Sequence, residues 1–282
     1  ARGQWQADGQ GGLGGHYRLQ ALNVQGGARD PQGGSRSWLA AQGLSADLAL
    51  GNGGGLQSLQ LAPGRVQLLT TALAWSQLQW QAAAVAEGND RLDVSAQLET
   101  IDVARLLSRL QPEMGWGGNL TVGGHIELHS AGKVDADVVL ERGGGDLSVT
   151  DELGRPQWLG LSDLRLALTA HNGLWQLAQG LAGKRIGSMA GAQVLQTTAE
   201  RHWPPANAPL QGVMEARVSD LGVWGTWVPP GWRLAGALDT TAQFSGTLGA
   251  PKFTGAMTGS QLGLRNVLQG VSLTDGELAI TL

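Results

Sequence analysis

Residues 120–140 read LTVGGHIELHSAGKVDADVVL, and this stretch decides the fold class. In its second half, the apolar Val134 and Val138 alternate with the carboxylates Asp135 and Asp137. Because successive side chains of a β-strand point to opposite faces, this period of two predicts strands with one apolar and one wet face. Strands of a buried parallel sheet would be apolar on both faces, and these are not.

The same alternation recurs along much of the chain, for example at 92–98, 164–169 and 278–282. Turn-forming residues separate the runs: Gly51-Asn52-Gly53, Gly88-Asn89-Asp90, Gly143-Gly144-Gly145, Asn172-Gly173 and Asp275-Gly276. Glycine supplies 45 of the 282 residues, an excess that we attribute to turns between short strands. The pattern predicts an all-β protein, as a sandwich, a barrel or a solenoid.

The apolar positions favour an open groove over a closed sandwich. A sandwich needs large inward side chains to fill about 10 Å between its sheets. The inward positions here are mainly Leu, Val and Ala, and the chain contains only 2 Phe. We therefore expect a long curled β-sheet or β-solenoid groove of repeated short strands with an apolar interior.

Helical signal is confined to two segments, 102–111 and, more weakly, 220–227. Each opens on an acidic residue and is followed by a Gly-Trp pair, at Gly115-Trp116 and Gly231-Trp232. The similarity predicts two units of an approximate repeat, 98–215 and 216–282, of which the second is incomplete. Because the chain opens with Ala1 and no signal pattern follows, we interpret 1–282 as an internal fragment of a larger groove protein.

Composition excludes several functional classes. The net charge is −4 and the Lys and Arg residues are scattered, so nucleic acid is not an expected partner. The absence of Cys removes disulfides, thiol nucleophiles and Cys-ligated zinc. No apolar run reaches the roughly 18 residues of a membrane-spanning helix, so we expect any membrane anchor to lie outside this fragment.

The sequence offers no compact active site. Motifs for a phosphate-binding loop, a serine nucleophile elbow and a zinc protease are missing, so we expect neither an enzyme nor a cofactor. His125, Glu127 and His129 share one strand face and could ligate a metal. The two histidines would stand about 13 Å apart, which favours a solvated face. Asp135 and Asp137 form an outward carboxylate pair, of the kind that a carbohydrate-cleaving β-helix would use, but no partner residues are visible.

The chain contains 11 Trp, and their role stays open between two interpretations. Trp combines a large apolar surface with a polar N–H, and so prefers boundaries between apolar and wet zones. The residues either cap strand ends or line the rim of a lipid-accommodating groove.

Four motifs carry a family resemblance: ERGGGDL (141–147), PPGWRLAG (229–236), SGTLGAP (245–251) and RNVLQGV (265–271). In this order they resemble the TamB family, the translocation and assembly module subunit of Gram-negative bacteria, which belongs to the AsmA-like, bridge-type lipid-transfer superfamily. The resemblance covers roughly residues 98–282. It implies a periplasmic protein that is anchored in the inner membrane, extends toward a TamA-like outer-membrane assembly barrel, and has a long sheet curled into an apolar groove.

The resemblance also implies phospholipid as the cargo and carries over no catalytic residues and no metal. The resemblance implies that the inward residues of the predicted strands line the groove. These expected lipid-lining residues are Leu92, Val94, Leu98, Leu120, Val122, Ile126, Leu128, Val134, Val138, Leu140, Leu164, Leu166, Leu168, Leu278 and Ile280.

Three functional hypotheses follow. The first is a bridge segment that conducts phospholipids between the inner and outer membranes. The second is an assembly factor that binds strands of outer-membrane proteins or autotransporters by β-augmentation and thereby serves protein secretion. The third is a carbohydrate-active β-helix, for which the sequence provides little support.

Overall fold

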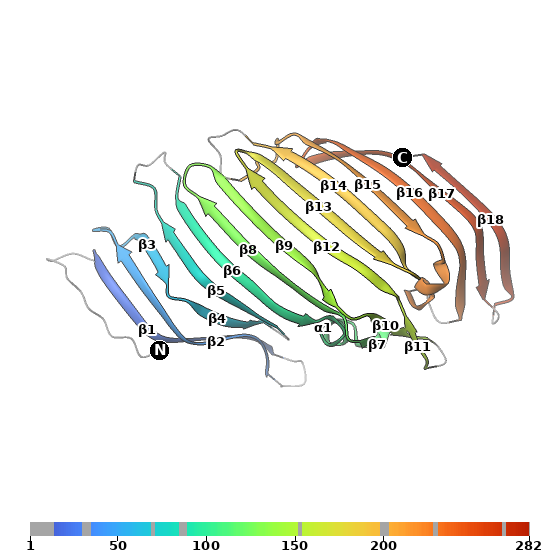
Figure 1. Ribbon diagram of the computed structural model, residues 1–282, viewed down its shortest axis with the longest axis horizontal. Helices are drawn as coiled ribbons and strands as arrows, with labels where there is room; N and C mark the ends of the chain where they lie inside the picture. The colour runs from blue at the N-terminus through green and yellow to red at the C-terminus, as the bar shows by residue number, and fades with distance from the viewer. Residues whose placement is uncertain are drawn as a thin grey trace.

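The computed structural model describes residues 14–29, 35–68, 71–84, 89–151, 154–197, 203–227, 231–266 and 269–281. Among these residues, 15 strands form one antiparallel sheet that arches along the whole molecule, as Figure 1 shows. Three short strands form a second sheet against one end of the long strands. The predicted all-β curled sheet is confirmed.

The large sheet consists of β1 (Gly15–Arg29), β2 (Ser35–Leu50), β3 (Leu56–Leu61), β4 (Gly64–Leu68), β5 (Thr71–Gln81), β6 (Arg91–Asp102), β8 (Thr121–Ser130), β9 (Val134–Gly144), β12 (Leu161–His171), β13 (Leu174–Gly183), β14 (Gly187–Gln196), β15 (Leu210–Val218), β16 (Trp232–Thr247), β17 (Ala250–Asn266) and β18 (Val271–Thr281). The small sheet has the order β11 (Pro156–Trp158), β10 (Leu147–Thr150) and β7 (Trp116–Gly118). The helical segments are α1 (Val103–Leu110), η1 (Pro112–Met114) and η2 (Leu221–Trp227).

The large sheet is a meander. Each of its strands pairs with the strand of the same sheet that comes next in the sequence. The exception is β4, which pairs with both β2 and β5. The predicted turn Asn172-Gly173 joins β12 to β13. The predicted turn Asp275-Gly276 is wrong, since both residues lie inside β18. Asp275 has a φ of 55°, and the pairing with β17 shifts register there, so the pair makes a bulge and the chain does not reverse.

Glycines inside the strands account for part of the glycine excess that we attributed to turns between short strands. A Cβ on Gly124 of β8 would lie 2.1 Å from the Val139 carbonyl oxygen of the neighbouring strand. A Cβ on Gly255 of β17 would lie equally close, 2.1 Å, to the Thr241 carbonyl oxygen. Only glycine permits this approach of two backbones, which lets long strands bend. The strands are also longer than expected, reaching 17 residues in β17.

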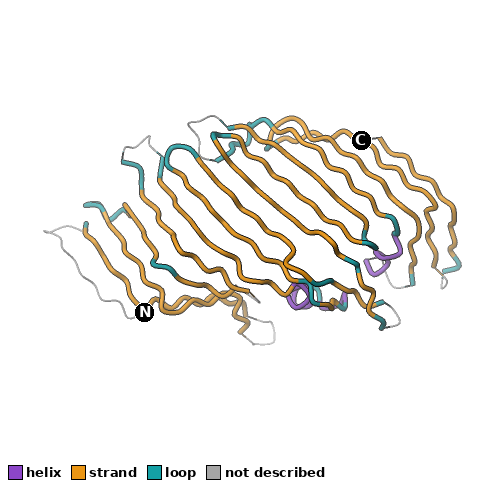
Figure 2. The backbone as a smooth tube through the Cα atoms, in the orientation of Figure 1, coloured by secondary structure: helices purple, strands orange, loops and turns teal. Residues whose placement is uncertain are grey.

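The predicted helix at 102–111 is confirmed as α1. Its N-cap is Asp102, whose carboxylate accepts a hydrogen bond of 3.0 Å from the Arg105 backbone N–H. The second predicted helix forms only the 3₁₀ segment η2. Its sequence contains Gly222 and Gly225, which are poor helix formers. Both helical segments lie at the same end of the long strands (Figure 2).

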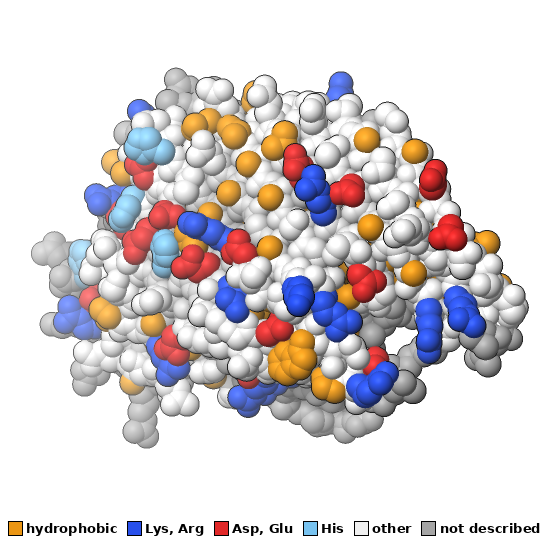
Figure 3. Space-filling view, turned by 45° about the vertical axis from the view of Figure 1, so that its right-hand side comes forward, with side chains coloured by type: hydrophobic (Ala, Val, Ile, Leu, Met, Phe, Trp, Pro, Cys, Tyr) orange, Lys and Arg blue, Asp and Glu red, His pale blue; other side chains and the backbone are white. Residues whose placement is uncertain are grey.

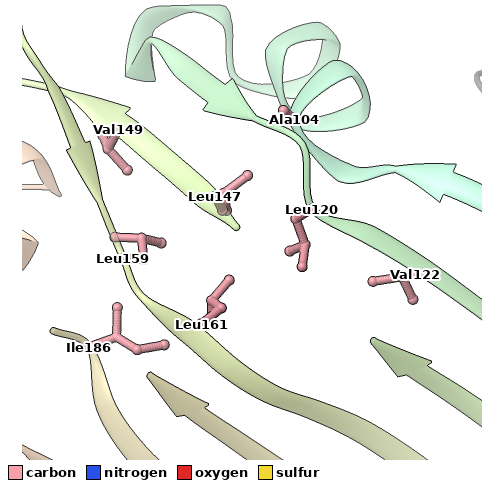
Figure 4. Packing of buried hydrophobic residues seen from close by; sticks show 8 residues of the cluster. All are labelled: Ala104, Leu120, Val122, Leu147, Val149, Leu159, Leu161 and Ile186. Atoms are coloured by element: carbon pink, nitrogen blue, oxygen red, sulfur yellow. The ribbon is translucent and has the colours of Figure 1, made fainter. Parts of the chain in front are cut away.

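Buried aliphatic side chains join the small sheet and α1 to this end of the large sheet. Leu120, which is 1% exposed, lies close to Leu147 and Leu161 in the centre of the cluster in Figure 4. The cluster comprises Ala104, Leu120, Val122, Leu147, Val149, Leu159, Leu161 and Ile186. This covered end holds the larger of two clusters of buried hydrophobic residues in the described ranges. No helix in the described ranges has the length and apolar character needed to span a membrane.

Candidate functional site

The strand registers place one apolar face on the inside of the arch. Residues directly opposite each other in an antiparallel pair share a face, so a chain of such pairs gives a row across the sheet. One row crosses 11 consecutive strands from β1 to β15 without a polar side chain. Its members are Leu19, Ala46, Leu61, Leu78, Val94, Leu128, Ala136, Ala170, Trp175, Leu195 and Leu210.

Three parallel rows extend this inner face. The second contains Trp75, Ala96, Ile126, Val138, Leu168, Leu177, Gln193, Gly212, Phe244 and Phe253. The third contains Leu98, Gly124, Leu140, Leu166, Gln179, Gly191, Met214, Ala242 and Gly255. The fourth contains Leu164, Leu181, Met189, Ala216, Thr240, Met257 and Ile280. None of these four rows includes a charged side chain.

Most of the predicted lining residues belong to this inner face. Ten of them are members of the four rows: Val94, Leu98, Ile126, Leu128, Val138, Leu140, Leu164, Leu166, Leu168 and Ile280. Leu92 and Val134 share a further row through Ser130, and Leu278 pairs with Gly259. Leu120, just before β8, and Val122, at the start of β8, lie instead in the covered cluster with α1 and the small sheet.

The inner face is curled and is accessible in part: Ala170 and Trp175 of the first row belong to a buried cluster, whereas other positions are exposed. Leu166, in the middle of the third row, is 44% exposed, and Ile280 is 42% exposed. A pocket of about 370 Å³ is lined by residues that range from Leu168 on β12 to Phe253 on β17. Strands this far apart in the order of the sheet can line one pocket only if the sheet curls around it. We call this curled inner face the trough.

The opposite, outer face carries paired charges. Asp93, His129 and Asp135 are neighbours in one row across β6, β8 and β9. The Nδ1 of His129 lies 3.1 Å from Asp93 Oδ1, and the Nδ1 of His171 lies 2.5 Å from Asp135 Oδ1. On the face seen in Figure 3, histidine and acidic side chains gather toward the left, while hydrophobic side chains occur mostly singly. Charge and apolar wall are therefore on opposite sides of the same strands.

Asp93 is an outer-face residue whose ionisation is perturbed by its surroundings. Its side chain is only 6% exposed, and burial by itself disfavours the charged form. Hydrogen bonds from Arg91, at 2.7 Å, and from His129 outweigh this cost. They hold the pKa of the Asp93 carboxyl below its usual value.

The motif of His125, Glu127 and His129 is divided among separate partners. His125 faces Asp137 at 3.4 Å, and Glu127 accepts a hydrogen bond of 2.7 Å from the Ser95 hydroxyl. In the part of the chain that the structure describes, no group of three or more His and carboxylate side chains is arranged to hold a metal ion. Asp135 and Asp137 are each engaged by a histidine.

Sequence reasoning missed two features of the structure around the trough. The first is the covered end, because the short strands β7, β10 and β11 have no clear period of their own. The second is the pocket, whose wall includes Trp175, Phe244 and Phe253. Trp175 is 5% exposed and its ring lies 5.6 Å from that of Trp203. Trp203 is 57% exposed, so the pair connects an exposed ring to the buried wall. The apolar residues at the alternate positions 175, 177 and 181 could have revealed the strand.

Comparison with known families finds a match to the family model described as TamB, N-terminal domain, over residues 81–258. The match covers more than half of the chain and extends from β6 to the first half of β17, so it includes all the residues that line the pocket. No curated protein and no solved structure matches the chain.

Proposed function

The chain belongs to the TamB family, and on this premise we propose that it is a periplasmic bridge segment whose trough conducts phospholipids between the inner and outer membranes. The observation that carries the proposal is the row of 11 apolar side chains from Leu19 to Leu210. The proposal assigns the chain no catalytic step. It places the membrane anchor and the contact with a TamA-like barrel in parts of the protein outside these residues.

The energetics of lipid transfer explain why an unbroken row matters. An acyl chain that leaves a membrane loses about 0.8 kcal/mol for each CH₂ group transferred to water. A phospholipid with two chains would therefore face a barrier on the order of tens of kcal/mol. A wall that is apolar at every strand removes most of this barrier along the whole route, and the polar headgroup can remain in solvent at the open side.

The geometry supports movement along the sheet. Neighbouring strands lie about 4.8 Å apart, so the large sheet measures roughly 60 Å across its strands from β1 to β18. Four parallel rows without charge give a lipid similar surroundings at each strand. Similar surroundings leave few deep minima in which a lipid would be trapped.

A charged residue on the wall should block transfer. In Leu166→Asp, a carboxylate replaces a side chain in the middle of the trough, where an acyl chain would have to pass over it. We expect the rate at which the chain transfers a fluorescent phospholipid between donor and acceptor vesicles to fall at least fivefold. Val138→Arg, one row away, should have the same effect.

The matched control is Ala178→Asp, which places the same charge on an exposed position of the outer face of β13. Transfer by this variant should equal that of the unmodified chain. Circular dichroism establishes that all variants keep their strand content. Normal transfer by folded Leu166→Asp and Val138→Arg would refute conduction through the trough.

A further inference from the structure

Two glutamines, Gln179 and Gln193, interrupt the apolar lining of the pocket, and Gln193 carries a buried polar atom without a partner. Gln193 of β14 is 9% exposed, and its side chain belongs to the second row of the inner face. Its Oε1 atom is buried and has no hydrogen-bond partner among the described residues. The pocket is lined by Leu168, Trp175, Leu177, Gln179, Gln193, Leu195, Leu210, Phe244, Leu248, Pro251 and Phe253. Gln193 therefore holds a buried, unpaired acceptor in a wall that is otherwise mostly aliphatic and aromatic.

The surrounding backbone is shaped to hold this amide. The Gln193 Nε2 atom donates to the Val213 carbonyl at 3.4 Å, which directs Oε1 away from that carbonyl. Gly212, the cross-strand partner of Gln193, has no side chain, and a Cβ there would lie 2.7 Å from the Gln193 Cγ. A Cβ at Gly191 would lie 3.2 Å from the Gln193 Nε2 and 2.6 Å from the Gln179 Nε2. Two glycines thus leave room for Gln193 to lie along the wall.

We infer that this pocket binds an aliphatic chain that carries a hydroxyl group, and that the hydroxyl donates a hydrogen bond to Gln193 Oε1. The inference rests on the proposed function, because it names a lipid class that would bind at one place in the trough. A buried acceptor without a partner costs free energy, and a ligand that supplies a donor recovers that cost. An unsubstituted alkyl chain fills the same pocket but leaves the acceptor unpaired.

The composition of the pocket favours a hydroxylated chain over a peptide strand. A peptide brings an N–H and a C=O group with every residue, and each needs a partner when it is buried. The pocket offers only the side chains of Gln179 and Gln193 among apolar ones, so it would leave most of these groups unpaired. A chain with a single hydroxyl matches the lining without such a loss.

The test compares octadecanoate with a series of octadecanoates that carry one hydroxyl group near the carboxylate, at mid-chain or near the methyl end. Titration calorimetry gives the Kd of each for the purified chain and for Gln193→Leu, which keeps the apolar volume and removes the acceptor. Gln193→Met is a second variant of similar length. Gln176→Leu is the matched control, because Gln176 is an exposed glutamine on the outer face of the adjacent strand.

We expect at least one hydroxylated isomer to bind the unmodified chain and Gln176→Leu about tenfold more tightly than octadecanoate does. In Gln193→Leu and Gln193→Met this preference should fall below twofold, while octadecanoate binds as before. Equal binding of all chains to the unmodified protein, or a preference that survives in folded Gln193 variants, would overturn the inference and leave the proposed function intact. Failure of every chain to bind would overturn both.

Discussion

At the scale of single residues, Asp93 links two side chains of the outer face. It accepts hydrogen bonds from Arg91 at 2.7 Å and from His129 at 3.1 Å, and its own side chain is nearly buried. Its pKa is lower in the folded chain than the usual value of 3.8. The ionised form therefore stabilises the fold fully above that value, and the contribution is lost as the pH falls through the lowered pKa.

Asp93→Asn should lower the free energy of unfolding by about 1–2 kcal/mol at pH 7, because two charge-assisted hydrogen bonds are weakened. The difference from the unmodified chain should shrink below pH 3.8 and vanish once Asp93 is protonated in the folded state. Urea unfolding at a series of pH values measures this. Asp163→Asn, which changes an exposed carboxylate on β12, should have little effect at any pH. A deficit for Asp93→Asn that stayed constant down to pH 2 would contradict the assignment.

At the scale of elements, the covered end and the open wall should respond differently to the same truncation. Leu120 is 1% exposed beneath α1 and the small sheet, whereas Leu166 is 44% exposed in the trough. Leu120→Ala should cost about 2–5 kcal/mol, because it leaves a cavity in a packed cluster. Leu166→Ala should cost less than about 1 kcal/mol, because its side chain has few atoms packed over it.

Urea denaturation of the two variants provides the comparison. Equal losses of stability would mean that the wall at Leu166 is packed as tightly as the cluster at Leu120. The trough would then be a closed interior, and the proposed conduction would have no open path.

The elements also show how far the sequence predicts this fold. Alternation identified β6, β8, β9 and β12, because each has one apolar and one polar face. The covered end could not be predicted in this way. Leu120 and Val122 continue the alternation of β8, but α1 and the small sheet cover them through contacts between segments distant in sequence. Asp275-Gly276 has the composition of a turn, and only its pairing with β17 distinguishes a bulge from a reversal.

The sequence predicts which face of a strand a residue lies on, because side chains alternate between the two faces. It does not predict contacts that depend on which strands are neighbours. The inward direction of Val138 and Leu166 follows from the sequence alone. The free acceptor of Gln193 does not, because it depends on the glycines opposite and on the curl that brings Phe253 into the same pocket as Leu168. The histidines of the outer face likewise find their partners on adjacent strands.

At the scale of the whole molecule, charge and apolar surface are sorted to opposite sides of one curled sheet. Histidine–carboxylate pairs lie outside on β6, β8, β9 and β12, and arginine–carboxylate pairs lie outside on β1 with β2 and on β15 with β16. The aliphatic rows lie inside. This division allows a long sheet to remain solvated on one side while it offers an apolar path on the other. We propose that acyl chains occupy that path.

The most direct test places a photoreactive amino acid at Leu166 or Ile280 on the wall, and at Ala178 on the outer face as the control. After irradiation of Gram-negative cells that produce the protein, mass spectrometry identifies the adducts. We predict phospholipid adducts at both wall positions and none at Ala178. Adducts with nascent outer-membrane proteins in place of lipid at Leu166 and Ile280, or lipid adducts equally frequent at Ala178, would contradict the account.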